Sequence, residues 1–111
     1  MDIITTHLHA DFDGLASMVA ASKLYPGAVL VFPGGAQETV HRFLAVHDLG
    51  LTRRRDLDLQ QGTRVILVDT QEPERLGSLQ PLCMNPEAEL ICSIYSALCC
   101  YFSTVHFYKP F

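Results

Sequence analysis

The chain has 111 residues, the length of one small domain, and 49% of its residues are hydrophobic against 18% charged. This globular composition excludes a disordered tail, a collagen-like repeat and a coiled coil. The net charge of -4 argues against a protein that coats nucleic acid by electrostatic attraction, but it leaves open one that acts on phosphate through bound metal ions.

The cysteines and the N-terminus predict a cytoplasmic protein. The four cysteines, Cys83, Cys92, Cys99 and Cys100, have no CxxC spacing, and none lies in the first 82 residues. A secreted disulfide scaffold would distribute its cysteines through the fold. The N-terminus also lacks a basic region followed by an apolar run, so we expect no signal peptide.

The first predicted elements are a strand and a helix. The short β-branched run at residues 2–6 is typical of a strand. The segment Gly14–Tyr25 has helical periodicity, with Asp13 in the position of an N-cap and Pro26 and Gly27 ending the helix. Its inner face is expected to carry Leu15, Met18, Val19 and Ser22.

The alternation of strands and helices continues along the first ninety residues. The apolar runs Ala28–Phe32 and Arg64–Asp69 are typical of strands that are covered on both faces. Weaker patterns predict a short helix at Glu72–Leu82 and a fourth strand at Glu87–Tyr95. The alternation predicts an α/β fold with a parallel sheet of about four strands and flanking helices. A second helix is predicted over Ala36–His47, with Val40, Phe43 and Leu44 facing inward.

The composition changes near residue 90. Residues 1–90 hold 19 of the 20 charged residues, whereas residues 91–111 hold only Lys109 and are rich in cysteine and aromatic residues. We therefore divide the chain into a domain, 1–90, and an apolar tail, 91–111, of unclear origin. The tail is interpreted as a strand with a poorly specified extension, as a membrane anchor, or as a segment foreign to the domain.

The tail is also expected to affect solubility. Its hydrophobicity is modest, so no stable membrane partner is expected. An uncovered β-prone segment with little charge favours self-association. On this interpretation, truncation at Glu89 would improve solubility without changing activity.

Two places at the carboxyl ends of predicted strands carry the chemistry. The loop after the first strand contains His7, Asp11 and Asp13, whose two carboxylates would repel each other without a cation. Asp69 stands where the Arg64–Asp69 strand ends, so it could share that cation. An imidazole with carboxylates suits Mn²⁺, or else Mg²⁺. The structural alternatives are a cap or turn role for Asp13 and Asp69, and an exposed or supporting role for His9.

The run Arg53-Arg54-Arg55 places three of the eight Lys and Arg residues side by side. A run of this kind between two predicted elements is usually a solvated loop. Phosphate binding is the alternative interpretation.

The first-strand loop resembles a known family. The spacing His-x-x-x-Asp-x-Asp-Gly-x-x-Ser, formed by His7, Asp11, Asp13 and Ser17, resembles the first motif of the DHH phosphoesterases, which include RecJ-like exonucleases and nano-RNases. Asp69 after an apolar strand resembles the second motif. The resemblance covers roughly residues 1–90, and the segments HADFDGLAS and FPGGAQE look most similar to the DHH domain that precedes CBS repeats in long bacterial tRNA nucleotidyltransferases of the poly(A) polymerase-like kind.

The resemblance implies a function. In the family, the residues that correspond to His7, Asp11, Asp13 and Asp69 bind two manganese ions, and Asp69 is the residue that we assign to catalysis. The implied reaction is hydrolysis of phosphodiester or phosphoanhydride bonds in nucleic acid or nucleotides, which are the implied partners.

The chain departs from the DHH pattern where the third motif, Asp-His-His, is expected. Residues 90–96 read LICSIYS, so the ligand set is incomplete, and we expect weak metal binding and little or no turnover. Two alternatives remain open. The box Asp11-Phe12-Asp13-Gly14 also resembles that of haloacid-dehalogenase-type phosphatases, in which the first Asp is a nucleophile. The second alternative is that the chain is a non-catalytic remnant of such a domain and has an interaction role.

Overall fold

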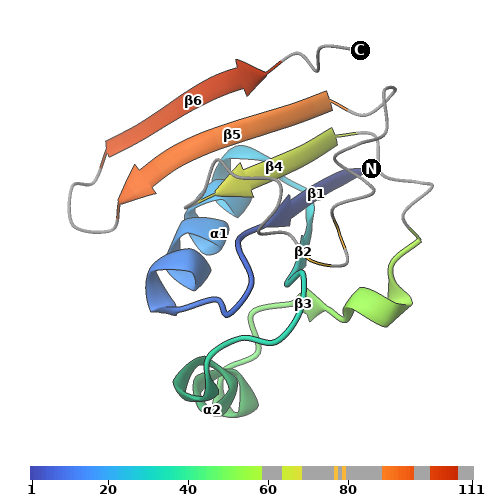
Figure 1. Ribbon diagram of the computed structural model, residues 1–111, viewed down its shortest axis with the longest axis vertical. Coiled ribbons are helices and arrows are strands. Elements are labelled where there is room, and N and C mark those ends of the chain that lie inside the picture. The colour runs from blue at the N-terminus through green and yellow to red at the C-terminus, as the bar shows by residue number, and fades with distance from the viewer. Residues whose placement is uncertain (59–63, 69–76, 78, 80–88, 97–100, 108–111) are drawn as a thin grey trace.

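The computed structural model describes residues 1–58, 64–68, 77, 79, 89–96 and 101–107, which include one six-stranded sheet. Its first five strands are parallel, and the sixth is antiparallel to the fifth. The spatial order is β3-β2-β1-β4-β5-β6 (Figure 1). The strands are β1 (Asp2–Thr5), β2 (Val29–Val31), β3 (Leu51–Thr52), β4 (Arg64–Val68), β5 (Glu89–Ser96) and β6 (Tyr101–Phe107).

The predicted α/β fold with a parallel sheet is confirmed, with more strands than expected. The additional parallel strand is β3, which has only two residues and therefore leaves no hydrophobic pattern in the sequence. The predicted helix at Glu72–Leu82 lies, except for Gly77 and Leu79, outside the described residues.

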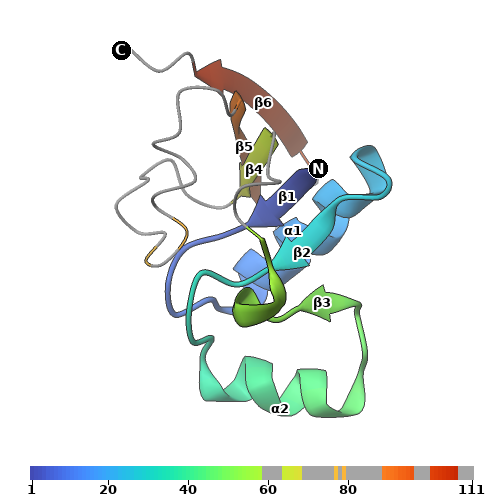
Figure 2. The same cartoon turned by 90° about the vertical axis from the view of Figure 1, so that its right-hand side faces the viewer.

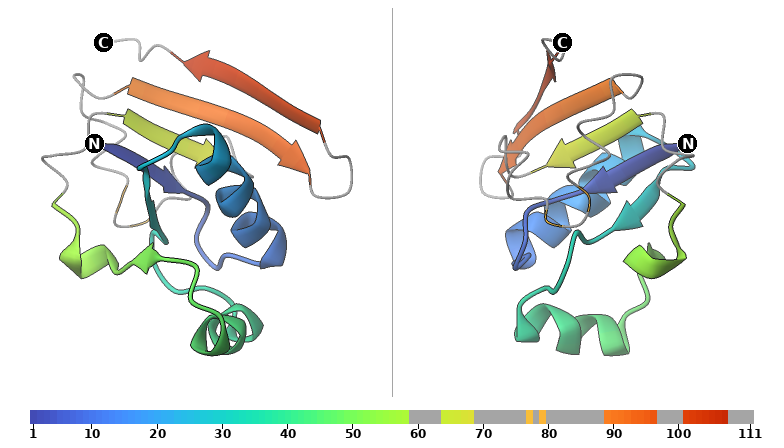
Figure 3. Two further views of the ribbon diagram at one scale, coloured as in Figure 1. Left: turned by 180° about the vertical axis from the view of Figure 1, so that it is seen from behind. Right: turned by 45° about the vertical axis from the view of Figure 1, so that its right-hand side comes forward.

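Helix α1 (Phe12–Leu24) covers one face of the sheet, as Figure 3 shows. The residues that it buries are Gly14, Leu15, Ser17, Met18 and Ala21. Three of these are small, which lets the helix approach the strands closely. Val19 and Ser22, which were predicted to face inward, are only half-buried.

The start of α1 corrects the assignment of its N-cap. The helix begins at Phe12, and the cap is Asp11, whose Oδ1 accepts the N–H of Gly14 at 2.9 Å. Asp13 lies inside the first turn. Both acidic residues favour this end of the helix, because its unpaired N–H groups and dipole attract negative charge. Asp11 and Asp13 are the same residue type two positions apart, so capping preference alone does not decide between them.

Alternation along the strands divides the core between the two faces of the sheet. Ile4 and Ile66 are fully buried under Met18 of α1. On the opposite face, Ile3 and Leu67 are equally buried. Leu57 and Leu79 pack against that second face, so the described residues supply apolar cover on both sides of β1 and β4.

Helix α2 (Glu38–Val46) stands away from the sheet, beyond β3 (Figure 2). Of its predicted inner residues, only Val40 is buried, whereas Phe43 is 37% exposed. The Phe43 ring packs edge-to-face on Phe12 of α1, with centroids 5.7 Å apart. α2 thus joins the rest of the molecule partly through another helix, which explains why its inner face is narrower than predicted.

Strand β5 crosses residue 90, the predicted boundary between domain and tail. It is parallel to β4, with Leu90 opposite Val65 and Ile91 opposite Ile66. Leu90 and Ile91 are only 6% and 1% exposed. The expected gain in solubility on truncation at Glu89 assumed that the removed segment is uncovered. That assumption is wrong for Leu90 and Ile91, because these two side chains belong to the core. The origin of residues 91–111 stays a prediction.

The remainder of the tail extends the same sheet. β6 pairs with β5 over seven residue pairs, from Leu90 opposite Phe107 to Ser96 opposite Tyr101. Among the described residues, no helix has the length and apolar character needed to cross a bilayer.

A bidentate ion pair joins β1 to β4 at the amino ends of these strands. Arg64 donates from Nε and Nη2 to the two carboxylate oxygens of Asp2, at 3.1 Å and 2.5 Å. The Asp2 carboxylate, through this hydrogen bond, raises the pKa of Arg64 above its ordinary value, so the guanidinium stays charged at neutral pH. The Arg64 guanidinium also lies 5.1 Å from the centroid of the Tyr25 ring.

We expect Asp2→Asn to lower the free energy of unfolding by about 1 kcal/mol, since the paired side chains are two-thirds or more shielded from solvent. Urea denaturation at neutral pH measures this loss. Glu38→Gln is the matched control, because it breaks the exposed Glu38–Arg42 pair on α2 and should cost only about 0.3–0.5 kcal/mol. Equal losses in the two variants would contradict a special role for the Asp2–Arg64 pair.

Candidate metal site

The candidate site lies where the order of strands reverses. From β1 the chain first proceeds to β2 and β3 on one side, and then returns to β4 and β5 on the other. In open α/β sheets, ligands bind beyond the carboxyl ends of the strands at such a reversal. β1 and β4 are direct neighbours here, with Thr5 opposite Leu67. The hydroxyl of Thr6 donates to the carbonyl of Val68 at 2.9 Å, which ties the two carboxyl ends together.

The loop that follows β1 is fixed by backbone pairing with the loop that follows β2. The N–H of His9 donates to Gly35 at 3.1 Å, and the N–H of Gln37 donates to Ala10 at 2.9 Å. His9 has φ +56°, a left-handed conformation that is uncommon outside glycine, and its side chain is exposed. The exposure agrees with the interpretation of His9 as a solvent-facing residue.

His7 is the candidate ligand nearest to the end of β1, and it is 7% exposed. Its Nδ1 lies 2.7 Å from the carbonyl oxygen of Leu8. Because a carbonyl oxygen only accepts, Nδ1 donates in this contact, and in a neutral imidazole Nε2 would then carry the lone pair. A histidine that binds a metal commonly donates its other ring N–H to a backbone carbonyl in this way.

The two candidate carboxylates occupy the start of α1. Asp11 uses Oδ1 to cap the helix and is half-buried, so its Oδ2 is the oxygen that a cation would take. Asp13 is exposed, and its backbone carbonyl accepts the hydroxyl of Ser17 at 2.8 Å. Ser17, the last residue of the first motif, therefore has a structural role within the helix.

The structure places His7 in the loop after β1, Asp11 at the N-cap of α1 and Asp13 in its first turn, but it does not gather these three predicted ligands into a cluster. Within the described part of the chain, no group of three or more His, Cys, Asp or Glu side chains is placed to hold a metal ion. Asp69 follows Val68 in the sequence and lies outside the described residues. The assignment of His7, Asp11, Asp13 and Asp69 as ligands stays a prediction.

Thr6 and Gly14 are structural residues of this edge that the sequence analysis did not single out. A Cβ placed on Gly14 would lie 3.1 Å from Thr6 Oγ1 and 3.3 Å from Thr6 Cγ2. The first turn of α1 therefore packs directly against Thr6, the residue whose hydroxyl is bonded to the carbonyl of Val68. The signal in the sequence was the glycine directly after the second aspartate of the first motif.

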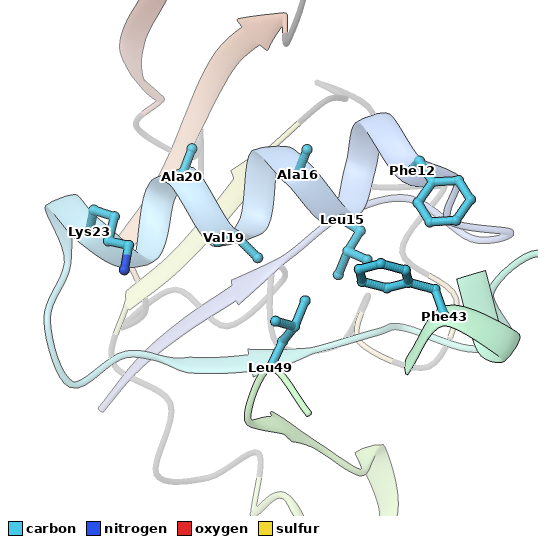
Figure 4. A pocket seen from close by; sticks show the side chains of 8 residues that line it. All are labelled: Phe12, Leu15, Ala16, Val19, Ala20, Lys23, Phe43 and Leu49. Atoms are coloured by element: carbon cyan, nitrogen blue, oxygen red, sulfur yellow. The ribbon is translucent and has the colours of Figure 1, made fainter. Parts of the chain in front are cut away.

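An apolar groove of about 380 Å³ lies between α1 and the side chains of Phe43 and Leu49 (Figure 4). Phe12 and Val19 of α1 line it, together with Phe43 and Leu49, and Lys23 stands at one end. Lys23 is the one charged residue among those that line the groove. The groove thus offers mainly packing surface, with one cation at its end and no acidic or imidazole group among the residues that line it.

The fold and the carboxyl ends of β1 and β4 define the class of this protein. It is a parallel α/β domain with a candidate ligand site where the strand order reverses. A scan against known protein families finds no match, and a search of solved structures finds none. The chain is 47% identical over 94 residues to a protein of Geobacter sulfurreducens named A-adding tRNA nucleotidyltransferase. The alignment takes in 81% of this chain but 11% of that protein.

The chain is thus related to a segment of a tRNA nucleotidyltransferase, as the resemblance of its loops predicted. It spans about a ninth of that protein's length, so the activity of the whole relative does not transfer by similarity alone. The DHH assignment and the manganese centre stay predictions.

Proposed function

We propose that this chain is a metal-binding phosphoesterase domain of the DHH type, which acts on phosphoester bonds of RNA or nucleotides when its ligand set is complete. The observation that carries the proposal is the Thr6–Val68 hydrogen bond across the reversal of strand order. It holds the loop with His7, Asp11 and Asp13 beside the strand end that Asp69 follows.

The residues present suit a divalent cation of the Mn²⁺ or Mg²⁺ kind. The Nδ1 contact of His7 with the Leu8 carbonyl suits a ligand that binds through Nε2, and Asp11 has a carboxylate oxygen beyond the one used in the cap. Asp13 and Asp69 would complete the set. When bound, a cation at this edge would polarise the phosphoester and lower the pKa of the attacking water. The chain's own contribution is to hold the loop rigid through its pairing with residues 35–37.

The relative's name supports a nucleic-acid substrate. The name A-adding tRNA nucleotidyltransferase describes a protein that acts on tRNA. We therefore place RNA first among the substrates, with a cytoplasmic location as part of the same proposal. With the third DHH motif missing, this chain alone should bind metal weakly and turn over poorly.

The haloacid-dehalogenase alternative is disfavoured by the position of Asp11. In that class the nucleophilic Asp directly follows its strand, whereas here β1 ends at Thr5 and Asp11 caps the next helix. A non-catalytic remnant predicts no metal site, so metal binding separates it from the proposal.

Asp11→Asn should weaken Mn²⁺ binding by at least about tenfold, because it removes a ligand charge. It should leave stability unchanged, since Asn caps a helix as well as Asp. Isothermal titration of the 111-residue chain with Mn²⁺ measures the affinity, and thermal unfolding measures the stability. Asp11→Ala should lose both the metal and about 1 kcal/mol of stability.

Asp56→Asn is the matched control, because Asp56 is exposed, lies on the 3-10 helix η1 (Arg54–Asp56) and is not among the predicted ligands. Unchanged Mn²⁺ affinity in Asp11→Asn would show that the ligand assignment is wrong. Hydrolysis of a generic phosphodiester should be slow in all variants. Fast Mn²⁺-dependent turnover that is lost in Asp69→Ala would show that the third motif is not needed.

A further inference from the structure

A second cavity, of about 280 Å³, lies beside the candidate metal site and has a different chemistry. Arg53, Arg54, His41 and Thr52 line it together with apolar residues. None of the residues that line it is acidic. In a chain of net charge -4, two arginines, a histidine and a threonine thus line one cavity together with Phe32, Leu44 and Leu51.

The cavity is built from the carboxyl ends of β2 and β3. These strands are parallel, with Val31 opposite Thr52, so the residues that follow each strand emerge at the same edge. Arg53 follows β3 directly and is the first residue before η1, and Arg54 is the first residue of η1. His41 reaches the cavity from α2, where its Nε2 accepts the N–H of Ala36 at 3.3 Å.

The cavity adjoins the loop of the candidate metal site. Gly34, which lines the cavity, packs so closely on Leu8 that a Cβ placed on it would lie 2.7 Å from Leu8 Cδ2. Leu8 follows His7, and the neighbouring residues are paired by the hydrogen bond from His9 to Gly35. A substrate that extends along this edge of the sheet would therefore meet the metal-site loop and the cavity in succession.

The structure assigns this cavity as a subsite for a second phosphate group of an oligonucleotide substrate, next to the phosphate that reacts. Guanidinium groups bind phosphate through paired, charge-assisted hydrogen bonds, and the Thr52 hydroxyl adds a donor. The half-buried ring of Phe32 offers a surface on which a base can stack. The inference rests on the proposed function for its substrate, and it gives Arg53 and Arg54 of the arginine run a role beyond that of a solvated loop.

Binding of fluorescein-labelled oligoadenylate to the 111-residue chain tests the assignment, in EDTA so that no metal contributes. Arg53→Gln should weaken binding about tenfold, the effect of one lost charge-assisted contact. It should also reduce the salt dependence of binding by a slope of about 0.7. Arg53 is exposed, so this variant should fold normally. Arg55→Gln is the matched control, because it makes the same change in the same run at a residue that does not line the cavity.

Equal weakening in Arg53→Gln and Arg55→Gln would overturn the subsite in favour of diffuse attraction. Undetectable binding to the unmodified chain would overturn it as well. Inorganic pyrophosphate that competes as strongly as unlabelled oligoadenylate would overturn the assignment to an extended substrate. The Mn²⁺ titration of Asp11→Asn is independent of these results, so the subsite and the proposed metal site can fail separately.

Discussion

Truncation of the chain after Glu89 is expected to abolish cooperative folding. The shortened chain would lack Leu90 and Ile91, which are almost fully buried on opposite faces of the sheet. It would also turn β4 into an edge strand, although Val65–Val68 are at most 1% exposed in the intact chain. An uncovered hydrophobic edge of this kind pairs with other chains.

The size of the effect follows from burial. Removing a large buried aliphatic side chain costs about 2–5 kcal/mol, so two such losses are comparable to the roughly 5–15 kcal/mol by which a typical domain is stable. Circular dichroism during thermal unfolding should show a single transition for the intact chain and none for the truncated one. Light scattering should show that the truncated chain associates more than the intact chain.

Truncation after Ser96 is the matched control. It removes β6 but keeps the whole of β5 and both buried residues. We expect this variant to retain a cooperative transition at a lower temperature. If the chain cut after Glu89 unfolds at the same temperature as the intact chain, residues 90–96 do not belong to the core and the tail is an independent appendage.

Gly14→Val is expected to destabilise the protein by about 1–3 kcal/mol, the usual cost of forcing extra atoms into a packed site. Even the first added carbon would be 3.1 Å from Thr6 Oγ1, and Val adds two methyl groups beyond it. Thr6 cannot give way easily, because its hydroxyl is bonded to Val68. Urea denaturation measures the loss of stability.

The same substitution should also weaken Mn²⁺ binding, because it displaces the turn that holds Asp11 beside the end of β1. Ala16→Val is the control, since Ala16 is exposed on the same helix and the change brings the same β-branched side chain. Helix propensity alone makes Val slightly better than Gly, by a few tenths of a kcal/mol. A Gly14→Val protein as stable as the Ala16→Val protein would show that the helix does not rest on Thr6.

Local patterns in the sequence determined most of the elements of this protein and predicted where its chemistry lies. The apolar run at residues 64–68 is a strand, and the periodic segment after Asp11 is a helix, because each pattern depends only on neighbours along the chain. The spacing of His7, Asp11 and Asp13 likewise singled out one loop. The same local patterns predicted a relationship to tRNA nucleotidyltransferases, which sequence similarity supports.

The tertiary structure alone decided which parts meet. It placed β4 beside β1, where a hydrogen bond joins Thr6 to Val68 across 62 positions in the sequence. It showed that Leu90 and Ile91 belong to the core, although they lie where the composition of the chain changes to that of the tail. It also brought Arg53, Arg54 and His41, from separate elements, to the lining of one cavity. Strand pairing and burial depend on contacts between residues that are far apart in the sequence. Hydrophobicity patterns and residue spacing describe only near neighbours along the chain, so they do not predict these contacts.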